Sequence, residues 1–302
     1  MRIVTVAAAL LLLLPSASSL ALRRKKYNFE AEGYSDDVSR SKIYPMSAAA
    51  YSDEPQKCVD KVFGKNAEIA GQTEVKCDFP GDRCFAFIVV SHSDEAIIIS
   101  FRGTEGSAEM QSIANDINFI HEKFEGGGKV GKWFLNAFQH LWKGGLKDHF
   151  LAARNKNPEY QVWITGHNTG GSIASIAAAS MIYEKVVSND KLLLVTMGQL
   201  RTGNRDYADA HDRLVKNSYR VVHNRDGAAH LPAENFEGYY HHGREIWYEN
   251  SMGPLDAFHE CKEGESSKCS DGLLFTLNFI DSYVYYDIWK STVTWGKDGC
   301  EL

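Results

Sequence analysis

A buried strand that turns directly into an Ala-rich helix is the most constraining feature of the sequence. The segment Trp163–Ala179 reads WITGHNTGGSIASIAAA, and its turn runs from Gly166 to Gly171. Glycines flank the turn because its central residue sits on a strained backbone, and the strand and helix around it leave no space for side chains. This architecture is typical of a nucleophile elbow. A hydrolase places Ser at the centre of such a turn, whereas this chain places Asn168 there.

Strand-like and helix-like segments alternate along the chain. Runs of β-branched and aromatic residues predict strands at residues 84–91, 95–101, 162–165, 192–197 and 219–223. Apolar spacings of three and four predict helices at residues 110–120, 130–141, 172–187 and 204–214. This order predicts the α/β class, with a mostly parallel central sheet and helices on both of its faces.

One domain is expected over residues 22–302, with its core at roughly 80–290. The 302 residues are 44% hydrophobic, which is enough for one sizeable core, and neither a repeat nor a low-complexity linker divides them. Residues 27–53 are polar and weakly patterned, and we expect them to wrap the domain surface.

The amino-terminal residues are typical of a secretory signal peptide. An apolar run at 3–14 follows Arg2, and small residues follow at 16–19. The run is shorter than the roughly 20 residues of a transmembrane helix, and no later run is long enough. We therefore predict a signal peptide at 1–21, a secreted extracellular protein, and no transmembrane anchor.

Six cysteines in an oxidising compartment predict three disulfides rather than metal ligation, and none of their spacings is typical of a zinc site. Sequence alone leaves 15 connectivities open. Proximity favours Cys77 with Cys84 across a turn that contains Pro80 and Gly81. Proximity also favours Cys261 with Cys269 across a polar loop, which leaves Cys58 to pair with Cys300.

The charge pattern argues against a nucleic-acid partner. Lys and Arg number 33 against 39 Asp and Glu, a formal net charge of −6, and no long stretch is basic. We expect neither a cofactor nor a metal.

Five blocks, in register over roughly residues 80–290, resemble the secreted class 3 (fungal-type) triacylglycerol lipase family of the α/β-hydrolase fold. The elbow GHNTGG is similar to the family's GHSLGG, and MGQLRTGN to its FGQPRVGN. The other blocks are IISFRGT at 98–104, YRVVHNRDGAAHLP at 219–232 and YHHGREIWY at 240–248. The resemblance implies a role in lipid metabolism and a lipid or acyl-ester ligand.

Carried over residue by residue, the resemblance implies a damaged triad. Asn168 holds the nucleophile position and Asp226 the intact acid position. The family's stretch with the triad His matches DSYVYY at 281–286, which places Ser282 at the His position. The implied oxyanion-hole residues are Thr104 and Thr169. Because an amide cannot replace a base-activated hydroxyl, we expect a pseudolipase.

Replacement catalytic groups are the alternative. Ser172 or Ser175 could serve as nucleophile, but both fall within the helix after the elbow, which favours a packing role. His259 is a lesser candidate for a displaced base. The other histidines of the matching blocks are expected to be structural, namely His167, His230, His241 and His242. Losing either the Ser or the His of a triad removes about 10⁶-fold in turnover, so little activity is expected without such a replacement.

A lid is expected at residues 105–119, where the family carries a short amphipathic helix. Met110, Ile113 and Ile117 share one face and could contact a lipid surface, although a core helix has the same pattern. Three hypotheses remain: a lipid-binding pseudolipase, an active hydrolase with a non-standard nucleophile, and a secreted scaffold that binds no lipid.

Overall fold

The computed structural model describes residues 27–77, 83–105, 120–274 and 278–301. The predicted signal peptide and the predicted lid residues Met110, Ile113 and Ile117 lie outside these ranges. None of the described helices is long and apolar enough to span a membrane.

An eight-stranded sheet forms the centre of the molecule, in the order β1-β2-β3-β6-β7-β9-β11-β12. Strands β3, β6, β7, β9 and β11 run parallel, and antiparallel pairs close both edges. Parallel strands covered on both faces are continuous apolar runs, which is the pattern that the sequence shows. The strands are β1 Ala67–Lys76, β2 Arg83–Ser91, β3 Ala96–Phe101, β6 Gln161–His167, β7 Leu192–Met197, β9 Ser218–His223, β11 Glu245–Tyr248 and β12 His259–Cys261.

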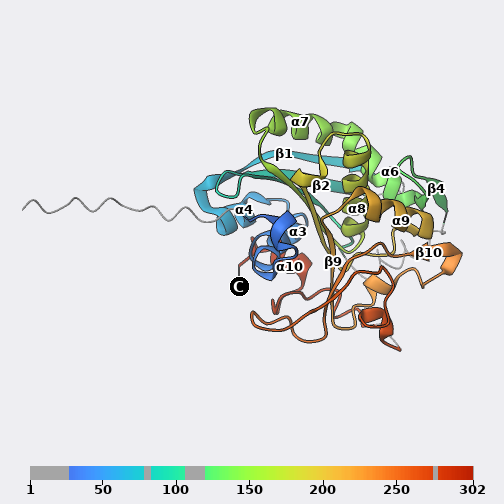
Figure 1. Ribbon diagram of the computed structural model, residues 1–302. Helices are drawn as coiled ribbons and strands as arrows, with labels where there is room; N and C mark the ends of the chain where they lie inside the picture. Colours follow the sequence, from blue (N-terminus) through green and yellow to red (C-terminus); the bar gives the residue numbers. More distant parts are fainter. Residues whose placement is uncertain (1–26, 78–82, 106–119, 275–277, 302) are drawn as a thin grey trace, which may run out of the picture.

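Helices cover both faces of this sheet (Figure 1). One face carries α6 Lys132–Leu141, α7 Lys147–Lys156, α8 Thr169–Tyr183 and α9 Arg205–Leu214. The other carries α1 Phe29–Glu32, α2 Asp36–Val38, α3 Tyr44–Ala49, α4 Gln56–Phe63 and α10 Thr292–Lys297. Alternate residues of β2 enter the two cores, Ile88 on the first face and Phe87 on the second. The predicted α/β architecture is therefore confirmed.

A second, smaller sheet in the order β10-β8-β5-β4 flanks the first. Its strands are β4 His121–Lys123, β5 Lys129–Gly131, β8 Gly203–Asn204 and β10 Tyr239–Tyr240. Short 3-10 turns lie at 64–66, 189–191, 228–230, 236–238 and 270–272, and π-helical turns at 39–43 and 142–146.

Three local predictions were wrong. Residues 27–53 do not wrap the surface, because α3 is buried against the sheet, where Ser47 contacts Thr165 at 2.6 Å. Val130 pairs with Gly203 in a strand instead of opening a helix. The helix after the elbow ends at Tyr183, short of the predicted end at residue 187.

The expected disulfide pairing is confirmed. Cys77 is joined to Cys84 and Cys261 to Cys269, with Cα–Cα distances of 5.7 Å and 6.3 Å. Cys58 of α4 is joined to Cys300, near the carboxyl end, at 5.0 Å. The third bridge ties the amino-terminal helices to the last turn of the chain.

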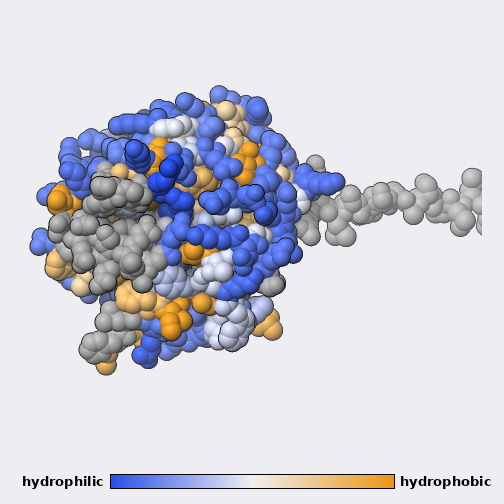
Figure 2. All heavy atoms as spheres, turned by 180° about the vertical axis from the view of Figure 1, so that it is seen from behind, coloured by the Kyte–Doolittle hydropathy of each residue, from blue (hydrophilic) through white to orange (hydrophobic). Residues whose placement is uncertain are grey.

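Most of the surface shown in Figure 2 is hydrophilic, and its hydrophobic side chains lie in small groups. Among the described residues, the most exposed large apolar side chains lie late in the chain. They are Leu255, Ile280, Leu274 and Trp289.

Candidate functional site

The predicted elbow is present between β6 and α8. Asn168 adopts φ +60° and ψ −126° and caps the amino end of α8. A Cβ atom on Gly166 would lie 2.3 Å from the Gly170 carbonyl oxygen, and one on Gly170 would lie 2.4 Å from the Phe101 carbonyl oxygen. The backbone approaches itself so closely that only glycine fits at these two positions. Asn tolerates the left-handed backbone at the centre better than most residues do.

The side-chain amide of Asn168 is held by one hydroxyl group and one backbone amide. Its Oδ1 accepts hydrogen bonds from the Thr169 backbone amide at 2.7 Å and from Thr104 Oγ1 at 3.0 Å. The Thr104 hydroxyl has one proton, so Thr169 Oγ1, 3.0 Å away, donates to Thr104 Oγ1. All three side chains are buried. The donors predicted at Thr104 and Thr169 thus meet at the amide oxygen of the elbow residue itself.

The Asp226 carboxylate is fully buried and accepts hydrogen bonds at both of its oxygens. Ser282 Oγ donates to Oδ1, which also accepts the Ala228 backbone amide at 2.8 Å. The Tyr285 hydroxyl donates to Oδ2. Burial, together with the negative charge of Asp226, raises the pKa of Tyr285 well above its usual value and keeps this donor protonated. The positions predicted for the triad acid and base are in direct contact, and a Ser hydroxyl stands where an imidazole would.

Tyr285 was missed in the sequence, although it lies three residues after Ser282 in DSYVYY. A buried Tyr hydroxyl requires a hydrogen-bond partner, so the three Tyr residues of this stretch were a usable signal. Nothing local indicated that the partner would be Asp226.

His167, the residue before Asn168, links the elbow to the segment that carries Ser282. Its Nε2 lies 2.6 Å from the Ser282 carbonyl oxygen, which can only accept, so Nε2 carries the proton. Its Nδ1 accepts from the Tyr51 hydroxyl at 2.8 Å. Burial lowers the pKa of His167, which keeps the ring neutral. With both nitrogens occupied, His167 has the structural role expected of it.

The two alternative nucleophiles are buried in α8 and engaged there. Ser172 Oγ donates to the Leu200 carbonyl at 3.2 Å. Ser175 Oγ lies 2.8 Å from the Tyr207 hydroxyl. Neither presents its hydroxyl to solvent.

The alternative base lies at the far edge of the main sheet. His259 is on β12, four strand positions from β6, which carries the elbow. Strands are spaced about 4.8 Å apart, so roughly 19 Å separates the two strands. Two other predicted structural histidines contact backbone carbonyls, His230 at Asp226 and His241 at Ala229.

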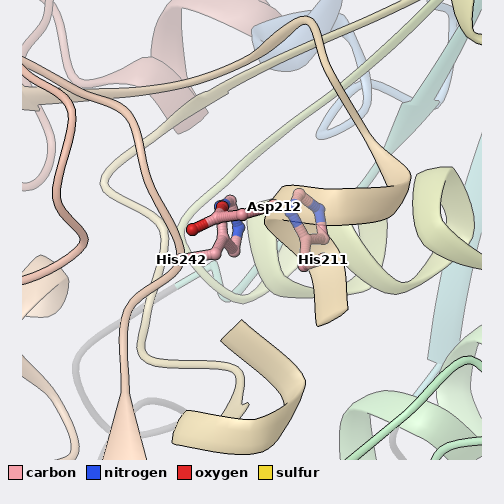
Figure 3. Close-up of side chains that lie close together, drawn as sticks. All are labelled: His211, Asp212 and His242. Carbon is pink, nitrogen blue, oxygen red and sulfur yellow. The ribbon is translucent and has the colours of Figure 1, made fainter. Parts of the chain in front are cut away.

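A second cluster lies at α9, where the buried His211 and the exposed Asp212 meet the buried His242 (Figure 3). Their nitrogen and oxygen atoms lie within 4.8 Å of one another, which is close enough for a shared metal ion. The two imidazoles are stacked with centroids 3.7 Å apart and planes 20° apart. Because lone pairs lie in the ring plane, stacked rings direct them side by side and not to a common point.

The hydrogen bonds of His242 also oppose metal binding. Its Nε2 accepts from Gln199 Nε2 at 2.8 Å, and its Nδ1 donates to the Gly243 carbonyl at 2.8 Å. Burial lowers the pKa of both His211 and His242, and the positive charge of Arg220 lowers both further. We interpret the cluster as a packed imidazole pair.

Comparison with known proteins places these features in a family. Residues 98–236 match the family described as Lipase (class 3). Lipase ZK262.3 of Caenorhabditis elegans is 30% identical over 290 residues, which cover 86% of this chain and 81% of that protein. A Fusarium solani protein named secreted mono- and diacylglycerol lipase 1 is 29% identical over 190 residues, covering 62% of this chain and 53% of that protein. The chain thus spans about half the length of this fungal relative.

A solved structure shares the architecture. Lipase II from Rhizopus niveus superimposes with a TM-score of 0.73 at 25% identity, covering 84% of this chain and 96% of that one. The α/β-hydrolase fold expected from the five sequence blocks is therefore confirmed.

Proposed function

The chain belongs to the class 3 lipase family, and from that premise we propose that it is a secreted pseudolipase that binds lipid or acyl-ester ligands without hydrolysing them. The observation that supports this proposal is the hydrogen bonding of Asn168, whose amide oxygen accepts from both Thr104 and Thr169. In this proposal those two residues form the oxyanion hole, and Asn168 Oδ1 occupies the position that an acyl oxygen would need.

Hydrolysis would require a nucleophile, a base and free oxyanion donors. Asn168 provides no ionisable proton and engages the donors, so a single residue removes two of these requirements. Ser282 supplies no base, and its hydroxyl is bound to Asp226. Loss of either the nucleophile or the base costs about 10⁶-fold in turnover, and residues of a triad act as a unit.

Ligand binding is proposed from the family, and secretion from the amino-terminal sequence. The Fusarium solani relative is named a secreted mono- and diacylglycerol lipase, which supports both assignments for this chain. Residues 110, 113 and 117 remain the proposed lipid-facing lid.

The absence of hydrolytic activity is tested with four proteins: the wild type, Asn168→Ser, Ser282→His and the double variant. The Asn168→Ser change removes the amide oxygen from the donors and adds a hydroxyl, while Ser282→His places an imidazole beside Asp226. In an assay with a short-chain p-nitrophenyl ester, we expect only the double variant to be active, at least about 10²-fold above the other three. Asp226→Asn in the double background should abolish the gain, and circular dichroism controls for folding.

Lipid binding is measured separately, by flotation of the wild type with a trioleoylglycerol emulsion. We expect flotation without release of fatty acid. Release that Ser172→Ala or Ser175→Ala abolishes would identify an active enzyme with a non-standard nucleophile. A protein that neither floats nor hydrolyses would contradict the proposal and favour the scaffold hypothesis.

A further inference from the structure

A cavity of about 330 Å³ lies where β9 and β11 end and the carboxyl-terminal segment crosses them. Its volume falls in the lower range of small-molecule sites. The residues that line it include Asn224, Asn250, Ser251, Asp281, Asp287 and Trp289. The proposed triad positions do not line it.

Two of the lining residues are fixed by their own hydrogen bonds. Asn250 donates through Nδ2 to the Ala257 carbonyl at 2.8 Å, and its Oδ1 accepts the Met252 amide at 2.9 Å. Asp281 Oδ2 accepts the Arg225 backbone amide at 3.1 Å. These contacts form a rigid polar wall.

Three other lining side chains are available to a ligand. Asn224, Ser251 and Asp287 make no side-chain hydrogen bond to any residue in the described ranges, yet all three face the cavity. Asn224 and Asp287 have left-handed backbones, with φ of +41° and +59°. Such conformations persist where the surrounding structure imposes them, and they cluster at ligand-binding segments.

The indole of Trp289 stands at the same cavity and is 91% exposed. Trp is rarely so exposed, because a large apolar ring gains free energy when its faces leave water. A flat ligand face that covers the indole would supply this burial. The cavity thus combines one aromatic platform with an amide, a hydroxyl and a carboxylate.

The chemistry of these groups selects one class of ligand. None of the lining residues is Lys or Arg, which disfavours a phosphate or carboxylate ligand. Among the described residues, Asp281 and Asp287 belong to no cluster close enough to ligate a metal ion. A single Trp is less than the aromatic cage that recognises a quaternary ammonium.

We propose that this cavity binds a neutral pyranose ring. The apolar C–H face of the sugar lies on Trp289, and its hydroxyls both donate and accept hydrogen bonds. Asp287 accepts, Asn224 does both, and Ser251 does both, so each available side chain matches a hydroxyl. The sugar can belong to a soluble glycan or to the headgroup of a neutral glycolipid.

Free sugars test the site without reference to lipid or hydrolysis. Saturation-transfer NMR on the purified full chain, with the methyl glycosides of glucose, galactose, mannose and N-acetylglucosamine at millimolar concentrations, should give transfer to at least one of them. Trp289→Ala should weaken that binding about tenfold, because stacking on an aromatic ring has about that value. Asp287→Asn, which keeps the shape and tolerates φ +59°, should weaken it several-fold.

The matched control is Phe236→Ala, which removes another exposed aromatic ring that does not line the cavity. It should leave the binding unchanged. Binding that is insensitive to Trp289→Ala and Asp287→Asn, absence of transfer to every sugar, or competition by choline alone would overturn the proposal.

A second arm identifies the source of the sugar. Phosphatidylcholine vesicles with and without glucosylceramide are floated with the wild type and with Trp289→Ala. Binding that requires both the glycolipid and Trp289 assigns a membrane glycolipid. Sugar binding in solution without such a difference assigns a soluble glycan. A failure of the lipid-emulsion experiment affects neither result.

Discussion

Two buried polar clusters in this fold differ in how completely their groups are paired. At the elbow, the Asn168 amide oxygen is bound by two donors, and both carboxylate oxygens of Asp226 accept hydrogen bonds. At α9, neither ring nitrogen of His211 has a hydrogen-bond partner within the described ranges, and neither does Nη1 of Arg220. Both clusters are inaccessible to solvent at these side chains.

The difference shows what loss of chemistry does to a buried site. A polar group left without a partner costs about 1 to 3 kcal/mol, so a substituted site is retained most easily when its new side chains satisfy one another. Asn168 accepts a hydrogen bond from the end of α8, and Ser282 donates one to Asp226. The polar groups of the His211 cluster do not satisfy one another in this way, and we expect this cluster to destabilise the fold at low pH.

The largest expected effect comes from breaking the paired cluster. Asp226→Ala leaves the Ser282 and Tyr285 hydroxyls buried without their acceptor, and it removes the nearer of the two acceptors of the Ala228 amide. We expect the free energy of unfolding to fall by about 3 to 5 kcal/mol, measured by urea denaturation at pH 7. The exposed Asp190 supplies a control, since Asp190→Ala should change it by less than about 0.5 kcal/mol. Equal stability of the two variants would show that the elbow network contributes nothing to the fold.

Features set by near neighbours in the sequence were predictable, and features set by distant ones were not. Alternation and glycine placement identified β6, the elbow and α8, because each depends on residues within one segment. Sequence similarity added the positions of Asp226 and Ser282. Their direct contact, 56 residues apart, required the fold.

The errors have the same origin. Tyr44 in the segment 27–53 is buried because α3 lies on β6, more than 100 residues later, although the segment itself is polar and weakly patterned. His211 and His242 come from different segments, and neither segment contains any sign of the other. Stacking between two such rings is visible only in three dimensions.

The second prediction tests the contrast between the two clusters through the pH dependence of stability. Burial and the charge of Arg220 lower the pKa of His211 to about 3, whereas the unfolded chain has the ordinary value of 6.5. Below pH 6.5 the unfolded state binds a proton that the folded state excludes, so stability is lost progressively as the pH falls from 6.5 towards 3. At pH 5 this loss is about 2 kcal/mol for His211 alone.

Other groups around His211 act in known directions. The pKa of His242, which stacks on His211, is also lowered, so His242 also makes the folded state less stable as the pH falls. Burial raises the pKa of Asp212 to about 6, so its contribution has the opposite sign between pH 6 and its unfolded value of 3.8. The Asp212 side chain reaches solvent, which screens that contribution. The neighbouring Tyr207 stays protonated throughout, because burial raises its pKa.

The measurement is urea denaturation at pH 7 and pH 5 for the wild type, His211→Gln and His140→Gln. The His211→Gln protein should lose about 2 kcal/mol less than the wild type between the two pH values. His140 is exposed, and its replacement should leave the pH dependence as it is. If the wild type and His211→Gln lose stability in parallel, His211 is already charged in the folded state and the contrast between the clusters is wrong.

The smallest effect separates the two contributions of Asn168 to the elbow. Asn168→Ala removes the oxygen that caps the Thr169 amide, and it puts a residue that disfavours positive φ at +60°. We expect a loss of about 1 to 2 kcal/mol in the free energy of unfolding. Asn168→Gly removes the same acceptor but tolerates the backbone, so its loss should be smaller than that of Asn168→Ala by about 1 kcal/mol, the cost of the backbone conformation. Calorimetric melting of the two variants resolves this difference. A loss in Asn168→Gly as large as in Asn168→Ala would assign the stabilisation to the hydrogen bonds with Thr104 and Thr169 rather than to the backbone. Asn would then suit this position because its oxygen accepts from both donors, more than because it tolerates the left-handed turn.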